Sequence, residues 1–451
     1  MENAGIRSNR MLFPCDFFEQ WGYNILYDND SFKSAKQGGQ SNFTAFITFK
    51  QNDGGFVPSD IYQDIWVSGQ PGTVNPGNSF ALCVSKMVKT YKADVKIYEV
   101  YNEPDWVANW QDTLTWNVSA PTNSQLARFD GDIYTYNRLL RIVWEVAKYF
   151  DPTCFIAPGG LGYTTFLDAI LRYTDSASNT NPSNTGRNYI DAMSTHFYPI
   201  YATNKNNSDQ YMKAYQNHQN AFQQVCKKYN FNPSIWIVTE VGVSTQTIGG
   251  YYGSDLIARN FFLKLPSYSV KSGVRQNHIF VLSDDNGSSD AHSRMGLYFD
   301  YANKPTATIK ESTKALKTWD YHLFDKTLDQ AKTIEFQSKL PSGVIVFAYS
   351  NSTSTCYLIW SDSSNYDKDD NTPSINCPIQ STGYFKQYDY LNNYSTLELL
   401  DDSVTIVTTS TPLFIYQTDS PNPSTSSTLR QSSIVAYLFC ILFIQLFILL
   451  L

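Results

Sequence analysis

The sequence has little charge and no concentration of charge of one sign. Only 17% of its 451 residues are charged, against roughly 25% in an average soluble domain. Thirty-four Lys and Arg residues and 41 Asp and Glu residues give a net charge of −7, without a long run of either kind. Because nucleic-acid binding needs a basic stripe that neutralises phosphates, no nucleic-acid partner is expected.

Metal and cofactor motifs are missing as well. The five histidines are scattered, and neither HExxH nor CxxC spacing occurs, so no metal and no cofactor is predicted. Of the seven cysteines, Cys356 and Cys377 fall in a late β-rich segment and are the best disulfide candidates. Four others are expected to be buried free thiols: Cys15, Cys83, Cys154 and Cys226.

The two ends of the chain point to different compartments. The N-terminus, MENAGIRSNRMLFPCDFFEQ, has no basic segment followed by an apolar stretch, so no secretory signal is visible. Residues 434–451 (IVAYLFCILFIQLFILLL) are apolar apart from one Gln and follow a Ser/Thr/Pro-rich linker at residues 419–433. This tail is typical of a glycosylphosphatidylinositol anchor signal, and a single C-terminal transmembrane helix is the alternative.

Asn-X-Ser/Thr sequons favour the extracellular interpretation. Each triplet alone is weak, but seven of them together with an anchor tail are coherent. They begin at Asn29, Asn42, Asn117, Asn206, Asn286, Asn351 and Asn393. We therefore expect a membrane-anchored glycoprotein at the cell surface.

Apolar strands alternate with amphipathic helices over residues 1–324. The clearest helix is residues 134–150 (YTYNRLLRIVWEVAKYF), and clear strands are expected at residues 95–100 (VKIYEV) and 234–241 (SIWIVTEV). This alternation requires parallel strands joined by crossover helices, which is an α/β fold.

The pattern changes after residue 325. Short strands, the first near Glu335, are separated by turns rich in Ser, Asn, Asp and Pro, which predicts a β-sandwich at residues 325–418. The acidic pairs Asp284-Asp285 and Asp369-Asp370 are expected in solvated turns.

Two glutamates lie at the ends of predicted strands. Asn102-Glu103-Pro104 follows VKIYEV, and Glu240 closes IWIVTE, 240 − 103 = 137 residues later. Because the carboxyl ends of strands in an α/β barrel converge on one face, we expect these carboxylates to face each other. Glycoside hydrolysis needs such a pair, with one carboxyl group protonated to donate to the leaving oxygen and one ionised to attack the anomeric carbon.

These motifs resemble those of the clan A glycoside hydrolases, which are retaining (β/α)₈ enzymes. Their signature is Asn-Glu-Pro after the fourth strand, here Asn102-Glu103-Pro104, and a Glu that ends the seventh, here Glu240. The resemblance implies a TIM barrel in which Glu103 is the acid/base and Glu240 the nucleophile. It also implies that Asn102 binds the sugar 2-hydroxyl. The appended β-domain fits branches that include β-xylosidases, iduronidases and glucosylceramidases.

Weaker matches extend the resemblance. His196-Phe197-Tyr198 matches the His-x-Tyr of the sixth strand, whose Tyr commonly orients the nucleophile, and Arg10 matches an arginine of the second strand that supports it. Trp106, with Trp110 and Trp116, lies in the loop after Glu103 and could stack on sugar faces, although loop packing explains these residues equally well.

Three departures from the family pattern stand beside these matches. If residues 5–10 start strand two, then strand one lies outside the given sequence, and we expect an N-terminally truncated barrel. The eighth strand, HIFVLSDD, lacks the Trp that the family usually places under the sugar, and the third, FTAFITF, lacks a His often seen there.

Taken together, the sequence predicts a retaining β-glycoside hydrolase. Its substrate would be an oligosaccharide, polysaccharide or glycoconjugate at the cell surface or outside the cell. The alternative is a catalytically inactive surface protein that binds glycans or has a structural role. Sugar and linkage are not disclosed by the sequence.

Overall fold

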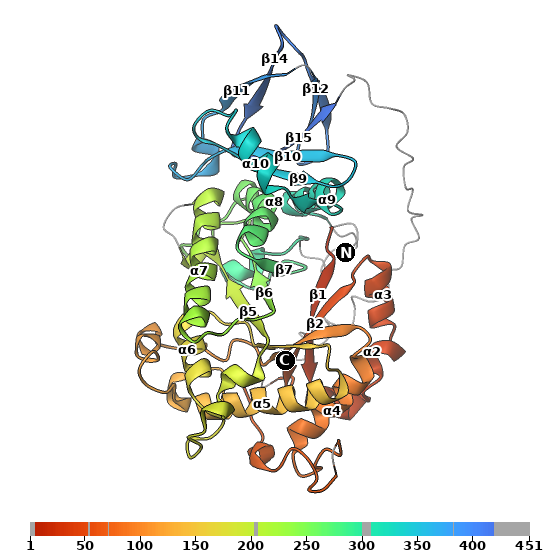
Figure 1. Cartoon of the computed structure of the whole chain (residues 1–451), viewed down its shortest axis with the longest axis vertical. Helices are drawn as coiled ribbons and strands as arrows, with labels where there is room; N and C mark the ends of the chain where they lie inside the picture. The colour runs from red at the N-terminus through yellow and green to blue at the C-terminus, as the bar shows by residue number, and fades with distance from the viewer. Residues whose placement is uncertain are drawn as a thin grey trace.

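The computed structural model describes residues 5–52, 55–70, 72–202, 206–299, 308–381 and 383–418. An α/β region is followed in the chain by an antiparallel β region, drawn in light to dark blue at one end of the molecule in Figure 1. The predicted linker at 419–433 and apolar tail at 434–451 lie outside the described residues. Among the helices that the structure does describe, none is long and apolar enough to cross a membrane.

The α/β region contains seven described parallel strands in two sheets, ordered β1-β2-β3-β4 and β5-β6-β7. The backbone of Leu161 links the two sheets, because its N–H donates to the carbonyl of Ser194 and its carbonyl accepts from His196 N–H (3.1 and 3.0 Å). The strands are β1 (Ser8–Pro14), β2 (Asn42–Thr48), β3 (Val95–Val100), β4 (Phe155–Pro158), β5 (Ala192–Phe197), β6 (Ile235–Val241) and β7 (Val274–Ile279). The predicted parallel α/β architecture is confirmed.

The two sheets also approach each other at β1 and β7. Within the described ranges no β-ladder joins these strands, and their link is a hydrogen bond from Ser8 Oγ to the carbonyl of Asn277 (3.4 Å). A cavity of about 510 Å³ lies at this seam, lined in part by Ile6, Asn42, Ile97 and Leu316. Among the described residues, the parallel strands therefore form two sheets with no ladder between β7 and β1.

Helices cover the outer faces of the parallel strands (Figure 1). The α-helices are α1 (Cys15–Trp21), α2 (Ile25–Asp28), α3 (Ser31–Gln37), α4 (Ser79–Tyr91), α5 (Ile133–Phe150), α6 (Thr164–Arg172), α7 (Ser208–Lys228), α8 (Asp255–Lys271), α9 (Glu311–Leu323) and α10 (Gln330–Gln337). Short 3₁₀ turns are η2 (Ser59–Tyr62), η3 (Trp110–Thr115), η4 (Asn123–Gln125), η5 (Pro182–Asn184), η6 (Gly186–Tyr189), η7 (Pro199–Tyr201), η8 (Ala291–Arg294) and η9 (Asp369–Asn371).

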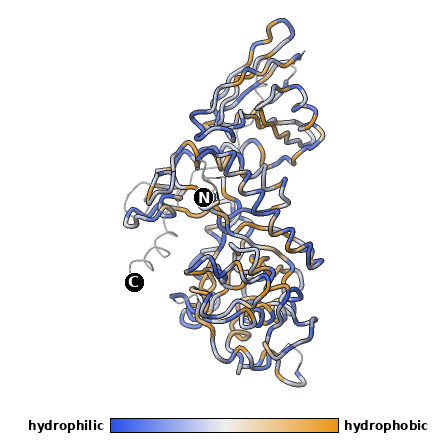
Figure 2. Tube along the Cα trace, turned by 90° about the vertical axis from the view of Figure 1, so that its left-hand side faces the viewer, coloured by the Kyte–Doolittle hydropathy of each residue, from blue (hydrophilic) through white to orange (hydrophobic). Residues whose placement is uncertain are grey.

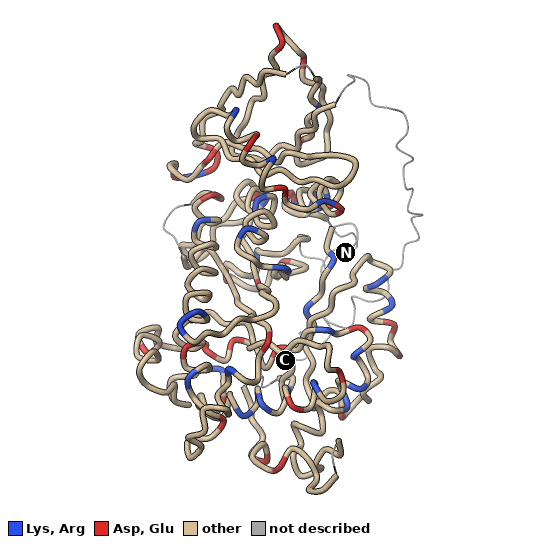
Figure 3. The backbone as a smooth tube through the Cα atoms, in the orientation of Figure 1, with Lys and Arg blue, Asp and Glu red and all other residues tan. Residues whose placement is uncertain are grey.

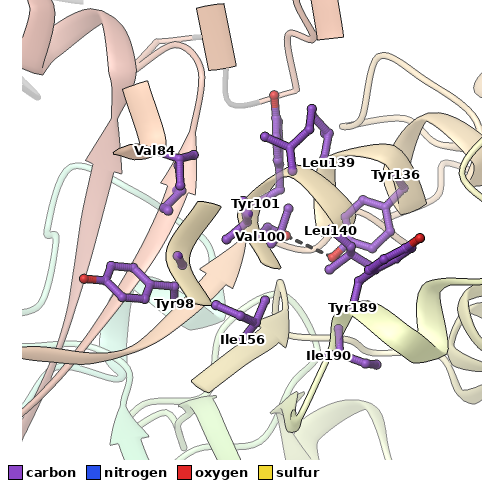
Figure 4. Packing of buried hydrophobic residues seen from close by; sticks show 14 of the residues in the cluster. Val84, Tyr98, Val100, Tyr101, Tyr136, Leu139, Leu140, Ile156, Tyr189 and Ile190 are labelled. Atoms are coloured by element: carbon purple, nitrogen blue, oxygen red, sulfur yellow. Dashed lines mark hydrogen bonds between the residues drawn. The ribbon is translucent and has the colours of Figure 1, made fainter. Parts of the chain in front are cut away.

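Local sequence explains how β3 and α5 are placed. The side chain of Asp132 caps α5 by accepting from Thr135 N–H (2.8 Å), and Pro152 prevents the helix from continuing. Side chains of a strand alternate between its faces, so Tyr98 and Val100 of β3 lie in the core under the helices. Figure 4 shows Val100 among these residues, with the hydroxyl of Tyr136 donating to its carbonyl (2.9 Å). The opposite face of β3 points toward the interior between the sheets.

The C-terminal region consists of two antiparallel sheets, with strand orders β13-β12-β15-β10-β9-β8 and β11-β14. Val346 and Ile359 of the larger sheet and Ile379 and Ile406 of the smaller one share a hydrophobic cluster. The strands are β8 (Thr327–Leu328), β9 (Val344–Ser350), β10 (Thr355–Ser361), β11 (Ile375–Gln380), β12 (Tyr384–Tyr388), β13 (Tyr394–Leu397), β14 (Ser403–Thr408) and β15 (Leu413–Thr418). The predicted strand near Glu335 is wrong: Asp329 caps α10 there by accepting from Lys332 N–H (3.0 Å).

A continuous core joins this β region to α8 and α9. Lys264 of α8 and Asp209 of α7 form a fully buried ion pair (2.8 Å), and the indole N–H of Trp360 on β10 donates to Asp209 (2.9 Å). Asp369 is also buried there and accepts from Ser208. The expectation that it lies in a solvated turn is wrong.

The same correction applies to Asp284. It forms a buried ion pair with Lys310 (2.6 Å) and accepts a hydrogen bond from Gly296 N–H. The local sequence around Asp284 does not predict these contacts, because the two partners lie 12 and 26 residues away in the chain.

Apolar, polar and charged residues are mixed along the whole described chain. Apolar and polar positions alternate along the trace in Figure 2, and Figure 3 shows Lys and Arg interleaved with Asp and Glu. In the view of Figure 3, the basic positions along the described backbone are spread among acidic ones.

The expected cysteine pairing is wrong. Cys15 at the start of α1 is bonded to Cys83 of α4, with Cα atoms 5.8 Å apart, and Cys356 and Cys377 are buried free thiols. On β10, Cys356 shares its face with Trp360 and packs toward the helices, whereas Cys377 lies in the cluster between the two antiparallel sheets. The alternation of side chains therefore puts these two thiols on opposite faces of the larger sheet.

The disulfide predicts a thermal-stability test. Replacing both residues (Cys15→Ala with Cys83→Ala) removes a cross-link between positions 68 apart, and chain entropy gives a loss of roughly 4 kcal/mol in the free energy of unfolding. Differential scanning calorimetry with and without reductant checks this. We expect reductant to lower the Tm of the wild type and of the control Cys356→Ala, but not that of the double variant. A reductant effect that survives in the double variant would disprove the pairing.

Candidate active site

Asn102 and Glu103 lie in a tight turn after β3. The backbone is left-handed at Tyr101 (φ 65°) and at Glu103 (φ 47°), conformations that cost energy for residues other than glycine. Two hydrogen bonds hold the turn, one from Glu103 N–H to the carbonyl of Gly159 (2.6 Å) and one from the Tyr101 hydroxyl to the carbonyl of Phe56. Such strain is concentrated at functional sites, and here it aims the Glu103 carboxyl group toward β5 and β6.

Glu240 lies near the end of β6, and both of its carboxylate oxygens accept a hydrogen bond. Arg10 Nη1 of β1 donates to Oε1 (2.7 Å), and the hydroxyl of Tyr198, just after β5, donates to Oε2 (2.6 Å). Burial raises the pKa of Tyr198, and the adjacent Glu240 raises it further, so this phenol stays a donor. The carboxylate of Glu240 is therefore fixed in orientation and held beside a permanent positive charge.

His196 of β5 lies between the two glutamates. Its Nδ1 is 2.9 Å from Glu103 Oε1 and 3.4 Å from Glu240 Oε2. Its Nε2 is buried without a hydrogen-bond partner and packs against Gly160, where a Cβ atom would come within 2.0 Å of it. A proton on Nδ1 satisfies the contact with Glu103, and glycine at position 160 leaves room for the ring.

Arg10 is the centre of a buried network that joins three strands. Its Nε donates to Glu99 of β3 (2.6 Å), its Nη1 to Glu240 and its Nη2 to Asn102 Oδ1 (2.7 Å each). Its guanidinium also stacks on the ring of Phe46 (4.2 Å). Burial alone would lower the pKa of Arg10, but Glu99 and then Glu240 raise it above its ordinary value. The guanidinium therefore stays charged inside the protein.

Glu99 itself is fully buried beneath the catalytic face. Its Oε1 accepts from the hydroxyls of Ser194 on β5 and Thr239 on β6 (2.8 Å for Thr239). With Arg10 on its other oxygen, this carboxylate has partners from three other strands, as a buried charge requires.

Arg128 and Trp106 cover the outer side of Glu103. Arg128 Nη1 donates to Glu103 Oε2 (2.8 Å), and its guanidinium stacks on the indole of Trp106 (4.2 Å). Burial alone would raise the pKa of Glu103. The hydrogen bond and charge of His196, followed by the charges of Arg128 and Arg10, outweigh burial and leave that pKa below its ordinary value.

Asp105 lies in the same turn and is buried. It accepts from the N–H groups of Gly162 (2.9 Å) and Tyr163 (2.8 Å), which fastens the loop after β4 to the turn of Glu103. Burial raises the pKa of Asp105 to about 7, although the backbone donor Tyr163 acts in the opposite direction.

The rim of the site is aromatic. Trp106 is 41% exposed and Tyr201 57% exposed, and the ring of Tyr201 packs edge-to-face on Tyr251 (5.2 Å). Trp116 is fully buried with its indole N–H on Gln125, so loop packing is its role. Trp110 is exposed at the start of η3.

At the eighth-strand position of the family pattern, this chain places Phe280 instead of Trp. The ring of Phe280 packs edge-to-face on Tyr198 at 5.8 Å. An aromatic side chain is thus present beside Tyr198, the hydrogen-bond partner of Glu240, despite the different residue type.

One set of side chains in the described structure has the composition of a metal site. Glu103, His196 and Glu240 each offer a donor atom, and these atoms lie within 4.8 Å of one another. However, Arg10 and Arg128 already donate to the two carboxylates, and their positive charges disfavour a cation there. The arrangement is better suited to proton transfer than to metal binding.

The structure brings most of the sequence-predicted residues into one cluster. They are Arg10, Asn102, Glu103, His196, Tyr198 and Glu240, with Trp106 on the rim next to Arg128. Sequence reasoning missed Glu99, Asp105 and Arg128. Glu99 and Asp105 flank the Asn102-Glu103 motif, so acidic residues at a strand end were a usable signal, whereas Arg128 had none because it lies 25 residues from its partner.

Comparison with known proteins supports the fold. No protein-family model and no curated protein sequence matches the chain. Among solved structures, a family 39 glycoside hydrolase from the gut symbiont Bacteroides cellulosilyticus matches with a TM-score of 0.60 at 14% identity, covering 92% of this chain and 76% of that chain.

Two further solved structures match over almost their whole length. A glucosidase from Croceicoccus marinus has a TM-score of 0.54 at 12% identity, covering 93% of this chain and 91% of that chain. A glycoside hydrolase family 30 subfamily 8 xylanase from Clostridium acetobutylicum has a TM-score of 0.51 at 12% identity, covering 93% and 90%. The expected likeness to clan A glycoside hydrolases is therefore confirmed at the level of the fold.

Proposed function

We propose that the protein is a retaining β-glycosidase that acts by double displacement. The observation that carries this proposal is the separation of the two carboxyl groups. An oxygen of Glu103 and one of Glu240 lie within 4.8 Å of each other. Retaining enzymes place these groups about 5–5.5 Å apart, whereas inverting enzymes leave about 6.5–9.5 Å for a water molecule.

In the first step Glu240 attacks the anomeric carbon. A bond forms between that carbon and a Glu240 oxygen while the glycosidic C–O bond breaks, and Glu103 gives its proton to the departing oxygen. In the second step the Glu103 carboxylate takes a proton from water, and the water oxygen attacks the anomeric carbon and releases Glu240. Arg10 and Tyr198 support both steps by holding the nucleophile in one orientation through hydrogen bonds to its two oxygens.

Asn102 is suited to bind the sugar 2-hydroxyl. Its Oδ1 is occupied by Arg10, so its NH₂ group is the part that can donate to the substrate. The exposed rings of Trp106 and Tyr201 offer flat apolar surfaces on which sugar rings stack.

The alternative is an inactive glycan-binding or structural protein. It would need neither a permanent positive charge beside Glu240 nor the strained turn at Glu103. Both features are present together, and they favour the enzyme.

Location at the cell surface is a further part of the proposal and rests on the sequence of residues 434–451. The sequons support it, because Asn29, Asn42, Asn117, Asn286 and Asn393 are exposed. Treatment of the natively expressed protein with peptide N-glycosidase should lower its mass and convert occupied Asn to Asp. An unchanged mass would contradict the glycoprotein assignment.

Covalent trapping tests the catalytic assignment. A panel of 2-deoxy-2-fluoro-β-glycosyl fluorides should leave a glycosyl group on the peptide that contains Glu240, detected by mass spectrometry. Glu240→Gln should form no adduct. Glu103→Ala should still form one, because fluoride leaves without a proton, yet should hydrolyse phenyl β-glycosides about 10²–10⁴-fold more slowly. An adduct that persists in Glu240→Gln, or no adduct with any sugar of the panel, would contradict the proposal.

The buried Glu99 predicts an effect on turnover from a residue that does not touch substrate. Glu99→Gln keeps the size of the side chain but removes the charge that holds Arg10, and misplacement of the nucleophile's support should lower kcat about 10²-fold while KM changes little. Steady-state kinetics on a phenyl β-glycoside measure this. Glu145→Gln, which loses an ion pair with Arg141 on α5, is the matched control and should keep wild-type kcat. An unchanged kcat in Glu99→Gln would refute a positioning role for Glu99.

A further inference from the structure

The guanidinium of Arg128 occupies two places that catalysis needs. It lies on the face of Trp106 at 4.2 Å, where a sugar ring would stack, and its Nη1 donates to Glu103 Oε2 at 2.8 Å. A sugar that stacks on the face of Trp106 that Arg128 covers must displace the guanidinium.

The hydrogen-bond pattern of Glu103 creates a second conflict. Its Oε1 faces His196 Nδ1 and its Oε2 accepts from Arg128, so donors occupy both oxygens. A general acid must carry a proton on one oxygen and direct it to the leaving group. Oε2 keeps a second lone-pair site, but the positive charge of Arg128 beside it favours the ionised carboxylate, so departure of Arg128 favours the protonated form that the acid needs.

The structure allows the side chain of Arg128 to move while its backbone stays fixed. Leu126 and Phe129 are buried on either side of it, and the N–H of Ala127 donates to the carbonyl of Trp106 (2.9 Å). The side chain itself is 52% exposed, and ion pairs in contact with solvent are weak. A substrate can therefore displace the guanidinium without disturbing the loop.

We propose that Arg128 is a displaceable partner of Glu103. In the free enzyme it covers Trp106 and pairs with the carboxylate, and a sugar ring on the leaving-group side stacks on Trp106 and takes its place. Displacement frees Glu103 Oε2 for the proton that it delivers to the glycosidic oxygen. Binding of the leaving-group sugar therefore also prepares Glu103 to donate its proton. This inference rests on the proposed glycosidase function.

Several groups other than Arg128 act on Glu103, and each lies on a different element. They are Arg10 on β1, Asp105 in the same turn, His196 on β5, Tyr198 after β5 and Glu240 on β6, with Tyr163 and Tyr201 further out. Replacement of Arg128 alters none of these residues, so the substitution tests the contribution of Arg128 to the titration of Glu103.

The direction of the pH effect follows from the role of Glu103. The acid must be protonated, so activity is lost as pH rises through its pKa, which is the alkaline limb of the profile. Arg128 is one of the groups that lower this pKa in the free protein. The alkaline limb of kcat/KM reports the free enzyme and that of kcat reports the complex with substrate. Removal of Arg128 should therefore move the first limb to higher pH and leave the second unchanged.

The experiment compares wild type, Arg128→Met and a matched control, Arg7→Met. Arg7 also stacks on an aromatic ring, that of Phe324 (4.2 Å), and also pairs with a carboxylate, Asp320 (2.7 Å), but it lines the cavity at the seam of β1 and β7. The substrate is a β-linked disaccharide of the sugar that the enzyme hydrolyses, because its leaving group is the sugar that would stack on Trp106 and is poor enough to make the first step limiting. Both kcat and kcat/KM are measured across pH.

We expect the alkaline limb of kcat/KM to shift upward in Arg128→Met alone, while the alkaline limb of kcat coincides in all three proteins. Equal shifts of both limbs would mean that Arg128 stays on Glu103 in the complex, and no shift would mean that it does not hold Glu103 at all; either result overturns the inference. A protein that hydrolyses no glycoside and forms no adduct at Glu240 refutes the proposed function itself, and the inference with it. The two failures are therefore distinguishable.

Discussion

The charge of Arg10 is the constraint on which the site depends. It lies inside the protein on β1 and donates to Glu99 on β3, Glu240 on β6 and Asn102 after β3. Removing one partner of a buried ion pair leaves the other charge uncompensated, which costs about 3–5 kcal/mol. Without Arg10, the buried Glu99 and the partly buried Glu240 would both lose this positive charge. The orientation of Glu240, the position of Asn102 and the burial of Glu99 therefore depend on the same guanidinium.

This network also explains how the two parallel sheets share one defined site. Between β7 and β1 the described residues form no ladder, and β1 pairs along its length with β2 alone. Arg10 ties this edge strand across the interior to β6, and Glu99 extends the tie to β5 through Ser194. On the outer side, Arg128 restrains Glu103 through a contact that is half exposed and weak. The site thus combines a buried, charged support for Glu240 with a half-exposed partner for Glu103.

The motifs that could be predicted are those in which local sequence and chemistry coincide. One predicted strand is followed by Asn102-Glu103-Pro104, and another ends in Glu240. Because the strand ends of a parallel sheet converge, this pattern predicted that the two glutamates would lie close together. Arg10, His196 and Tyr198 were found through family resemblance and do contact the two glutamates.

The predictions that were wrong concern residues whose partners lie far away in the sequence. Cys15 and Cys83 meet only because α1 packs against α4, and Asp284 becomes a buried ion only because Lys310 reaches it. Arg128 likewise could not be predicted, because its contact with Glu103 joins residues that are 25 positions apart in the sequence.

The central claim, double displacement at Glu103 and Glu240, is tested most directly by proton NMR of a β-glycoside during hydrolysis. The account predicts that the first-formed sugar is the β anomer, which later mutarotates. If the α anomer forms first, the mechanism is inverting and the account is contradicted.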